Sequence, residues 1–139
     1  MQIRVFDYAD EPAVIALWQT CGLTRPWNDP HIDIARKCIE QPDLFLVAEA
    51  DGSIVGCVMG GYDGHRGSIN YLAVSPAQRG EGVGRALVEQ LEQMLCLRGC
   101  PKINLQVRLD NAGANGFYEA LGYEQFHVTD FGKRLILDT

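Results

Sequence analysis

Three glycines at alternate positions, followed at once by an amphipathic segment, are the feature of this sequence best suited to bind a ligand. They are Gly80, Gly82 and Gly84, and the surrounding residues 73–87 read AVSPAQRGEGVGRAL. Glycine lets a backbone turn tightly and bring its N–H groups close to a ligand. The first turn of a helix has unpaired N–H donors and a partial positive charge. The pattern therefore predicts an anion site, with phosphate as the natural ligand.

Two arginines flank this loop. Arg79 and Arg85 can add charge-assisted hydrogen bonds to a phosphate. The dinucleotide fingerprint G-x-G-x-x-G does not fit, because Arg85 and Leu87 occupy the places of its third glycine, and the G-K-[ST] end of a P-loop is missing. Both nucleotide-binding patterns are therefore disfavoured. A glycine-rich turn that holds no ligand is the alternative to a phosphate site.

A second segment, residues 110–124, reads DNAGANGFYEALGYE and lies one predicted strand further along the chain. The loop at residues 79–84 resembles the R/Q-x-x-G-x-G/A loop that binds acyl-CoA in the GNAT superfamily of N-acetyltransferases. The second segment resembles that family's N-x-x-A-x-x-F/L-Y-E-x-L-G-F/Y pattern. The matching positions are Asn111, Ala114, Phe117, Tyr118, Glu119, Leu121, Gly122 and Tyr123. Shorter stretches (RPWNDP, GGYDGHRGS and GCPKI) are similar to the small bacterial YpeA-type acetyltransferases of this superfamily.

The resemblance implies acetyl-CoA as co-substrate and no metal. It implies that the pantetheine arm lies between two splayed parallel strands and pairs with the backbone of one of them, as an added strand would. The glycine loop would hold the pyrophosphate. The coenzyme contacts implied in this way are Leu72, Ala73, Val74, Arg79, Gly80, Gly82, Val83, Gly84, Arg85 and Asn111.

The resemblance also implies direct attack of an amine on the thioester, without a covalent enzyme intermediate. Tyr118 matches the family's tyrosine that protonates the leaving thiolate, although a core aromatic on an amphipathic helix would look the same. A primary alkylamine has a pKa of about 10.4, so a base or an ordered water chain must remove a proton at neutral pH.

The base is harder to assign from the sequence. Relatives that acetylate protein N-termini use a glutamate in a strand motif L-E-V-R, and this chain has Gln106 in its place. Glu49, Asp63, His65 or water are the remaining candidates, and each of the three side chains also reads as an ordinary surface or turn residue. The departure argues against an N-terminal peptide acetyltransferase of the usual kind. We expect the acceptor, a small amine or a lysine side chain, to meet the loops at residues 21–30 and 62–67.

Rival functions follow from the same residues. A domain of this fold that senses acyl-CoA without transferring the acyl group is the main alternative, because no glutamate base is apparent. A toxin-like or structural partner protein is a third possibility, and neither the acidic charge nor the surface composition favours it.

The elements that position these residues follow the order β-α-α-β-β-β-α-β-α-β-β. The strands at residues 68–74 and 102–107 flank one helix, so they should run parallel with a right-handed crossover. Tight turns make the earlier strands antiparallel, and two final strands are predicted at residues 123–129 and 132–138. We expect a mixed α/β (α+β) fold: a mostly antiparallel sheet of about seven strands, with a central parallel pair splayed around acyl-CoA and four helices on both faces.

Composition limits the functional classes. The 139 residues fit one domain over residues 1–139, with 47% hydrophobic residues, and the net charge of −6 makes nucleic acid or an anionic membrane an improbable partner. Five cysteines without a C-x-x-C pair indicate free thiols in a reducing cytoplasm, as does the absence of a signal peptide pattern. We expect a monomer or a homodimer.

Overall fold

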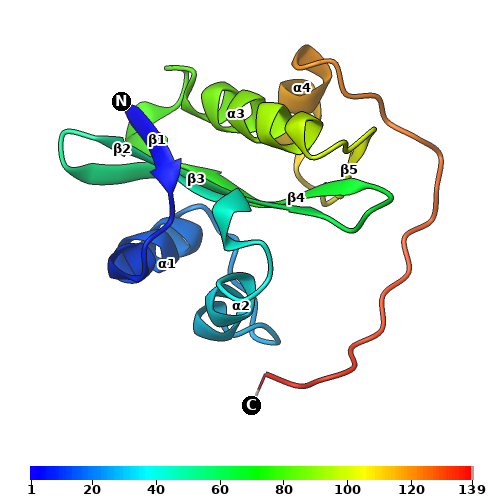
Figure 1. Ribbon diagram of the computed structural model, residues 1–139, viewed down its shortest axis with the longest axis horizontal. Coiled ribbons are helices and arrows are strands. Elements are labelled where there is room, and N and C mark those ends of the chain that lie inside the picture. The colour runs from blue at the N-terminus through cyan, green and yellow to red at the C-terminus, as the bar shows by residue number, and fades with distance from the viewer. Residues whose placement is uncertain (139) are drawn as a thin grey trace.

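The computed structural model describes residues 1–138, which form a five-stranded sheet with helices on both faces (Figure 1). The strands lie side by side in chain order: β1 (Gln2–Val5), β2 (Phe45–Ala50), β3 (Ser53–Tyr62), β4 (Gly67–Val74) and β5 (Ile103–Leu105). The α-helices are α1 (Glu11–Thr20), α2 (Pro30–Lys37), α3 (Val83–Leu97) and α4 (Ala112–Ala120). The first four strands pair antiparallel and β4 pairs parallel with β5, which confirms the mixed sheet expected from the sequence.

The sheet separates two apolar layers. Helices α1 and α2 cover one face, where Trp18 and Phe45 are fully buried, and α3 and α4 cover the other. The four-residue spacing of apolar side chains on α3 places Leu87, Leu91 and Leu95 against the sheet, as predicted. Gly60 of β3 allows this close approach, because a Cβ there would lie 2.3 Å from a methyl of Leu91. No helix within residues 1–138 is long and apolar enough to span a lipid bilayer.

Local signals explain where the helices begin. Asp29 accepts a hydrogen bond from the backbone N–H of His31 and starts α2, and Asn111 caps α4 in the same way. Asp10 precedes α1 as expected, but its carboxylate does not cap that helix. Its two oxygens instead accept hydrogen bonds from the Arg4 guanidinium, at 2.8 and 2.9 Å.

Strand β4 carries a β-bulge at Tyr71. Two of its residues, Tyr71 and Leu72, lie opposite the single residue Val58 of β3. Tyr71 has a φ of 52°, in the left-handed region where glycine is the usual residue of such a bulge. The extra residue changes which face the following side chains occupy: Tyr71 and Ala73 pack towards α1 and α2, whereas Leu72 and Val74 pack towards α3.

The parallel pair is short. β4 and β5 are paired only from Gly67 opposite Ile103 to Ile69 opposite Leu105. Beyond Ile69, strand β4 continues to Val74 with no described strand on that side, so one edge of its backbone is open. The strand predicted at residues 102–107 therefore ends earlier than expected. The opening lies directly before the glycine loop.

The two final strands predicted at residues 123–129 and 132–138 are wrong, and with them the count of about seven strands. Residues 124–138 leave α4 and run in an extended path past the β5 end of the sheet to the side of α2 (Figure 1). A strand needs a neighbouring edge, and this segment is held elsewhere: the Asp138 carboxylate accepts a hydrogen bond from the Asp29 backbone N–H at 2.9 Å and pairs with Arg36 at 2.8 Å. Its large apolar side chains are exposed, namely Phe126, Val128, Phe131, Leu135, Ile136 and Leu137.

Candidate active site

The glycine loop joins β4 to α3 and leaves backbone donors free. Gly80 and Gly82 have φ values of 84° and 83°, which bring the chain around so that α3 begins at Val83. The first helical hydrogen bond runs from the Ala86 N–H to the Gly82 carbonyl at 3.0 Å. No described residue accepts a hydrogen bond from the backbone N–H groups at positions 83–85. Free donors at a helix start suit an anionic oxygen.

Glycine is favoured at these three positions for two different structural reasons. A Cβ at Gly80 or Gly82 would meet nothing within 4 Å, so the positive φ, not space, requires glycine there. A Cβ at Gly84 would lie 3.3 Å from the Phe117 ring and 3.4 Å from a Val74 methyl. Gly84 therefore lets β4, α3 and α4 meet directly behind the loop.

The two flanking arginines are both exposed at this loop. The Arg79 guanidinium lies 3.9 Å from the Cys21 sulfur, at the end of α1. Arg85 pairs with Glu89 one turn along α3, with its Nε 2.9 Å from the carboxylate. An exposed pair of this kind is worth little free energy, so it leaves Arg85 available to an incoming anion.

The last residues of β4 adjoin the loop. Ala73 is buried, while Leu72 and Val74 are half-buried. The Val74 carbonyl accepts a hydrogen bond from the Cys21 thiol at 3.3 Å. On the side away from β3, residues 70–74 have no strand partner within the described chain. This edge can hydrogen-bond an extended ligand as a further strand would.

Tyr118 lies on α4, on the face of the sheet that carries α3. Its ring contacts Phe117 and Tyr123 edge to face, with centroids 5.1 and 5.5 Å away. Burial raises the pKa of the Tyr118 hydroxyl to about 12, so the group keeps its proton at neutral pH. Asn111 starts the same helix, and its side-chain oxygen is engaged by the Ala114 N–H at 3.2 Å.

Two of the side chains considered as bases, Glu49 and Asp63, have other partners. Glu49 lies on β2, separated from β4 by β3, and pairs with Arg4 at 3.3 Å. Asp63 accepts hydrogen bonds from the N–H groups of Arg66 and His65, which hold the pKa of its carboxyl below the ordinary value and shape the turn before β4. Gln106 donates to Asp130 at 2.5 Å. The structure therefore does not bring Glu49 or Asp63 to the open edge of β4.

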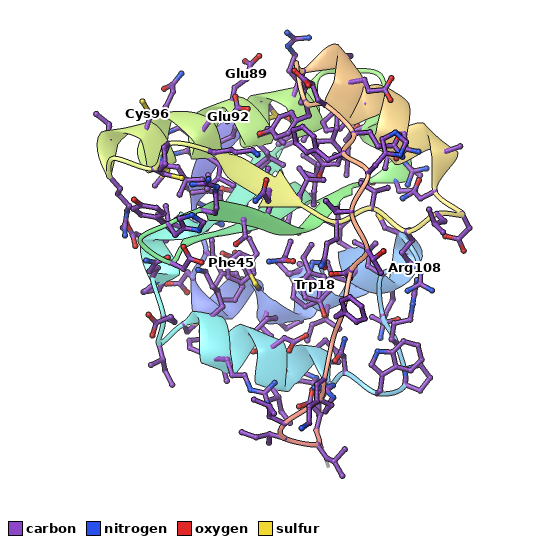
Figure 2. The ribbon with its side chains drawn as sticks, turned by 90° about the vertical axis from the view of Figure 1, so that its right-hand side faces the viewer. Trp18, Phe45, Glu89, Glu92, Cys96 and Arg108 are labelled. Atoms are coloured by element: carbon purple, nitrogen blue, oxygen red, sulfur yellow. The ribbon has the colours of Figure 1, made fainter. Side chains whose placement is uncertain are left out.

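One constellation beside the open edge is not apparent from the sequence. The Tyr71 hydroxyl donates a hydrogen bond to Asp33 of α2 at 2.6 Å, and the Tyr71 ring stacks on Trp18 of α1 with centroids 3.8 Å apart. Figure 2 shows Trp18 and Phe45 between the sheet and the two helices α1 and α2. The bulge that aims Tyr71 at Asp33 depends on non-local pairing, so no local pattern signals it.

A resident metal has no evident site in residues 1–138: no group of three or more His, Cys, Asp or Glu side chains is placed to hold one there. All five cysteines are free thiols, and Cys57 is fully buried beside Trp18.

Comparison with known proteins agrees with this geometry. The family model described as the acetyltransferase (GNAT) family matches residues 10–123. An acetyltransferase of Pectobacterium atrosepticum is 58% identical over 138 residues, which cover 99% of this chain and 98% of that protein. An acetyltransferase of Yersinia enterocolitica is 56% identical with the same coverage.

Solved structures give the same result. Ard1 from Thermoplasma volcanium has a TM-score of 0.77 and 31% identity, covering 87% of this chain and 80% of that one. The ribosomal-protein-S18-alanine N-acetyltransferase from Escherichia coli has a TM-score of 0.71 and 25% identity, covering 87% and 76%. With a mixed sheet, a glycine loop at a helix start and these relatives, the chain belongs to the GNAT acetyltransferase family and is an acyltransferase.

Proposed function

We propose that this enzyme transfers an acetyl group from acetyl-CoA to an amine acceptor. The observation that carries the proposal is that free backbone donors at the start of α3 adjoin the open edge of β4. A ligand with a phosphate at one end and an amide-bearing arm at the other would satisfy both features at once.

The residues fit acetyl-CoA. The amides from Gly80 to Arg85, including those of Gly82, Val83 and Gly84, would bind the pyrophosphate together with the Arg79 and Arg85 side chains. The backbone of Leu72, Ala73 and Val74 would pair with the pantetheine amides, and Asn111 would contact the arm from the start of α4. The thioester supplies an activated acetyl carbonyl, and the protein supplies its orientation.

In the reaction, the neutral amine attacks the carbonyl carbon, and the thiolate leaves with a proton from an acid. Tyr118 is the proposed acid, because its hydroxyl is neutral at physiological pH and lies on the helix that faces the glycine loop through Phe117 and Gly84. Since Glu49 and Asp63 are engaged elsewhere, we infer that water or His65 removes the amine proton.

The acceptor is proposed to be a small-molecule amine or a lysine side chain. The Escherichia coli neighbour is named for an alanine of ribosomal protein S18. In this chain Gln106 stands where the family resemblance places the basic glutamate of relatives that acetylate protein N-termini. A glutamine amide does not accept a proton at neutral pH. The net charge of −6 is compatible with a cationic acceptor.

Two measurements test the proposal. Calorimetric titration with desulfo-CoA should give saturable binding, and release of free CoA should follow addition of one member of an amine panel. No binding would overturn the coenzyme assignment. Binding without turnover on any amine would instead favour the alternative, a domain that senses acyl-CoA.

A further inference from the structure

The geometry points to Asp33 as a positioning residue for acetyl-CoA. We propose that its carboxylate holds Tyr71, and through Tyr71 the bulge of β4, in the form that presents the backbone of residues 72–74 to the thioester arm. This inference rests on the proposed function, because it assigns a role in the coenzyme site that the function requires.

The first step is that the bulge has an unfavourable backbone. Tyr71 has a φ of 52°, and a left-handed conformation disfavours L-residues with a large side chain. Glycine or asparagine would adopt this conformation more readily than an aromatic residue does. A strained residue persists only where its surroundings hold it, and such residues concentrate at functional sites.

The second step is that two helices hold the side chain. The Tyr71 ring lies 3.8 Å from Trp18 at an interplanar angle of 12°, and Trp18 is itself fixed by burial and by its indole N–H donating to the Cys57 sulfur at 3.2 Å. The Tyr71 hydroxyl reaches Asp33 at 2.6 Å, a short, charge-assisted hydrogen bond. Arg36 lies 3.6 Å from the other oxygen of Asp33.

The third step concerns which backbone groups face the open edge. In a strand the N–H and C=O of one residue face one edge, and those of the next residue face the other edge. One inserted residue therefore exchanges the residues whose backbone groups face each neighbouring strand. Ile69 packs towards α3, and without the bulge Tyr71 would share that face. Release of Tyr71 from Asp33 would favour this re-pairing. Ser75 donates to the Val55 carbonyl of β3 at 2.8 Å, so Ala73 also faces β3, whereas Leu72 and Val74 face the open edge. After re-pairing, the donors and acceptors of Leu72 and Val74 would turn from the open edge towards β3.

The role of Asp33 also links the two substrates. Asp33 belongs to α2, directly after the loop at residues 21–30 that we expect to border the acceptor. Tyr71 belongs to the strand expected to bind the coenzyme. A single hydrogen bond therefore connects the acceptor side of the site to the coenzyme side.

The experiment is a double-mutant cycle on coenzyme binding. Tyr71→Phe keeps the stacked ring and removes the hydroxyl, Asp33→Ala removes the acceptor, and a third protein carries both changes. For each, desulfo-CoA affinity is measured by calorimetry, with KM for acetyl-CoA and for the amine. We expect each single variant to weaken coenzyme binding about tenfold, the size of one charged hydrogen bond. The double variant should lose no more than either single one.

Controls separate positioning from stability. Tyr8→Phe removes the hydroxyl of an exposed tyrosine between β1 and α1, outside the proposed site, and it should leave coenzyme affinity unchanged. Asp33→Asn keeps an oxygen that can accept from Tyr71, so it should recover part of the affinity lost in Asp33→Ala. If Asp33→Ala does not fold, Tyr71→Phe and Asp33→Asn carry the test.

The outcomes are distinct. If the unmodified enzyme does not bind desulfo-CoA, the proposed function fails. If it binds and Tyr71→Phe or Asp33→Ala binds equally well, the positioning role is overturned while the function stands. Additive losses in the double variant, or an equal loss in Tyr8→Phe, would also overturn it.

Discussion

At the scale of single residues, a substitution at Tyr118 should change the catalytic rate without changing the stability of the fold. No described residue hydrogen-bonds its hydroxyl, so that group contributes little to folding. If it is the acid, Tyr118→Phe should lower kcat by about 100-fold, within the range of general acid catalysis, and leave the urea midpoint unchanged or slightly raised. Steady-state kinetics and urea unfolding on the same protein check both parts. An unchanged kcat would remove Tyr118 from the mechanism.

Asp10, in contrast, has a structural role, so a substitution there should change the stability of the fold. It is 9% exposed, and its carboxylate accepts hydrogen bonds from the Arg4 guanidinium and the Asp7 N–H. Asp10→Ala leaves the Asp7 N–H without its acceptor and the Arg4 guanidinium with one carboxylate partner, that of Glu49, and it should lower the free energy of unfolding by about 2–3 kcal/mol. The measurement is urea unfolding near neutral pH.

Asp43 offers a matched control for Asp10. Its carboxylate also pairs with an arginine, Arg98, but the Asp43 side chain is 50% exposed. Asp43→Ala should therefore cost less than about 1 kcal/mol. Equal losses in the two variants would contradict the assignment of a buried, structural carboxylate to Asp10.

Sequence reasoning reaches some of these residues and misses others for a physical reason. Asn111 and Asp29 are predictable as helix caps, because capping depends on local spacing alone. The partners of Asp10 and Tyr71 are not, since they are set by how distant segments pair. The roles of the coenzyme contacts and of Tyr118 stay predictions until they are measured.

At the scale of elements, the link from β4 to α3 depends on backbone conformation. Gly82 has a φ of 83° and open space around its Cα, so an alanine there fits sterically but strains the backbone. Gly82→Ala should lower stability by about 1–2 kcal/mol and weaken CoA binding at least tenfold, because relaxation of the strain moves the amides at the start of α3. Urea unfolding and calorimetry with CoA measure the two effects.

The same substitution within α4 should have the opposite sign. Gly116 lies inside the helix without a positive φ, and a methyl group added at its Cα would meet nothing within 4 Å. Gly116→Ala should raise stability by about 0.5–1 kcal/mol, because it reduces the freedom of the unfolded chain, and should leave CoA affinity unchanged. If both variants weaken CoA binding equally, the special role of the loop is refuted.

The elements themselves are largely predictable. Period-four apolar spacing on α3 and the turns Asp51-Gly52 and Asp63-Gly64 are local signals, and the structure confirms them. The prediction of two final strands is wrong because the alternation of apolar residues in 124–138 indicates only that this segment could form a strand. Whether an edge is available is a property of the assembled sheet.

At the scale of the whole molecule, one buried thiol and three half-buried tyrosine hydroxyls make stability sensitive to alkali. Burial raises the pKa of Cys57 and Tyr118 to about 12, and it raises that of Tyr71 and Tyr123 as well. In the unfolded chain these groups lose their protons at the ordinary values, 9.0 for the thiol and 10.0 for the phenols. The unfolded state therefore binds fewer protons than the folded state above that range.

Stability should thus be at its full value below about pH 9 and fall as the pH rises towards 12. Urea midpoints measured in steps between about pH 8 and pH 11 check this trend. Tyr123→Phe removes one of the contributing groups and should make the decline shallower. A midpoint that is constant across this range would contradict the stated burial of these side chains.

The stacked pair of Trp18 and Tyr71 has a spectroscopic consequence. Trp18 is fully buried with a thiol 3.2 Å from its indole nitrogen, whereas Trp27 is 59% exposed. Replacing Trp27 with phenylalanine would leave one tryptophan, Trp18, which stacks on the bulge residue Tyr71 and can be excited selectively. Its emission would then report the local geometry of β4 in real time, so that rapid-mixing fluorescence could follow coenzyme arrival without any attached dye.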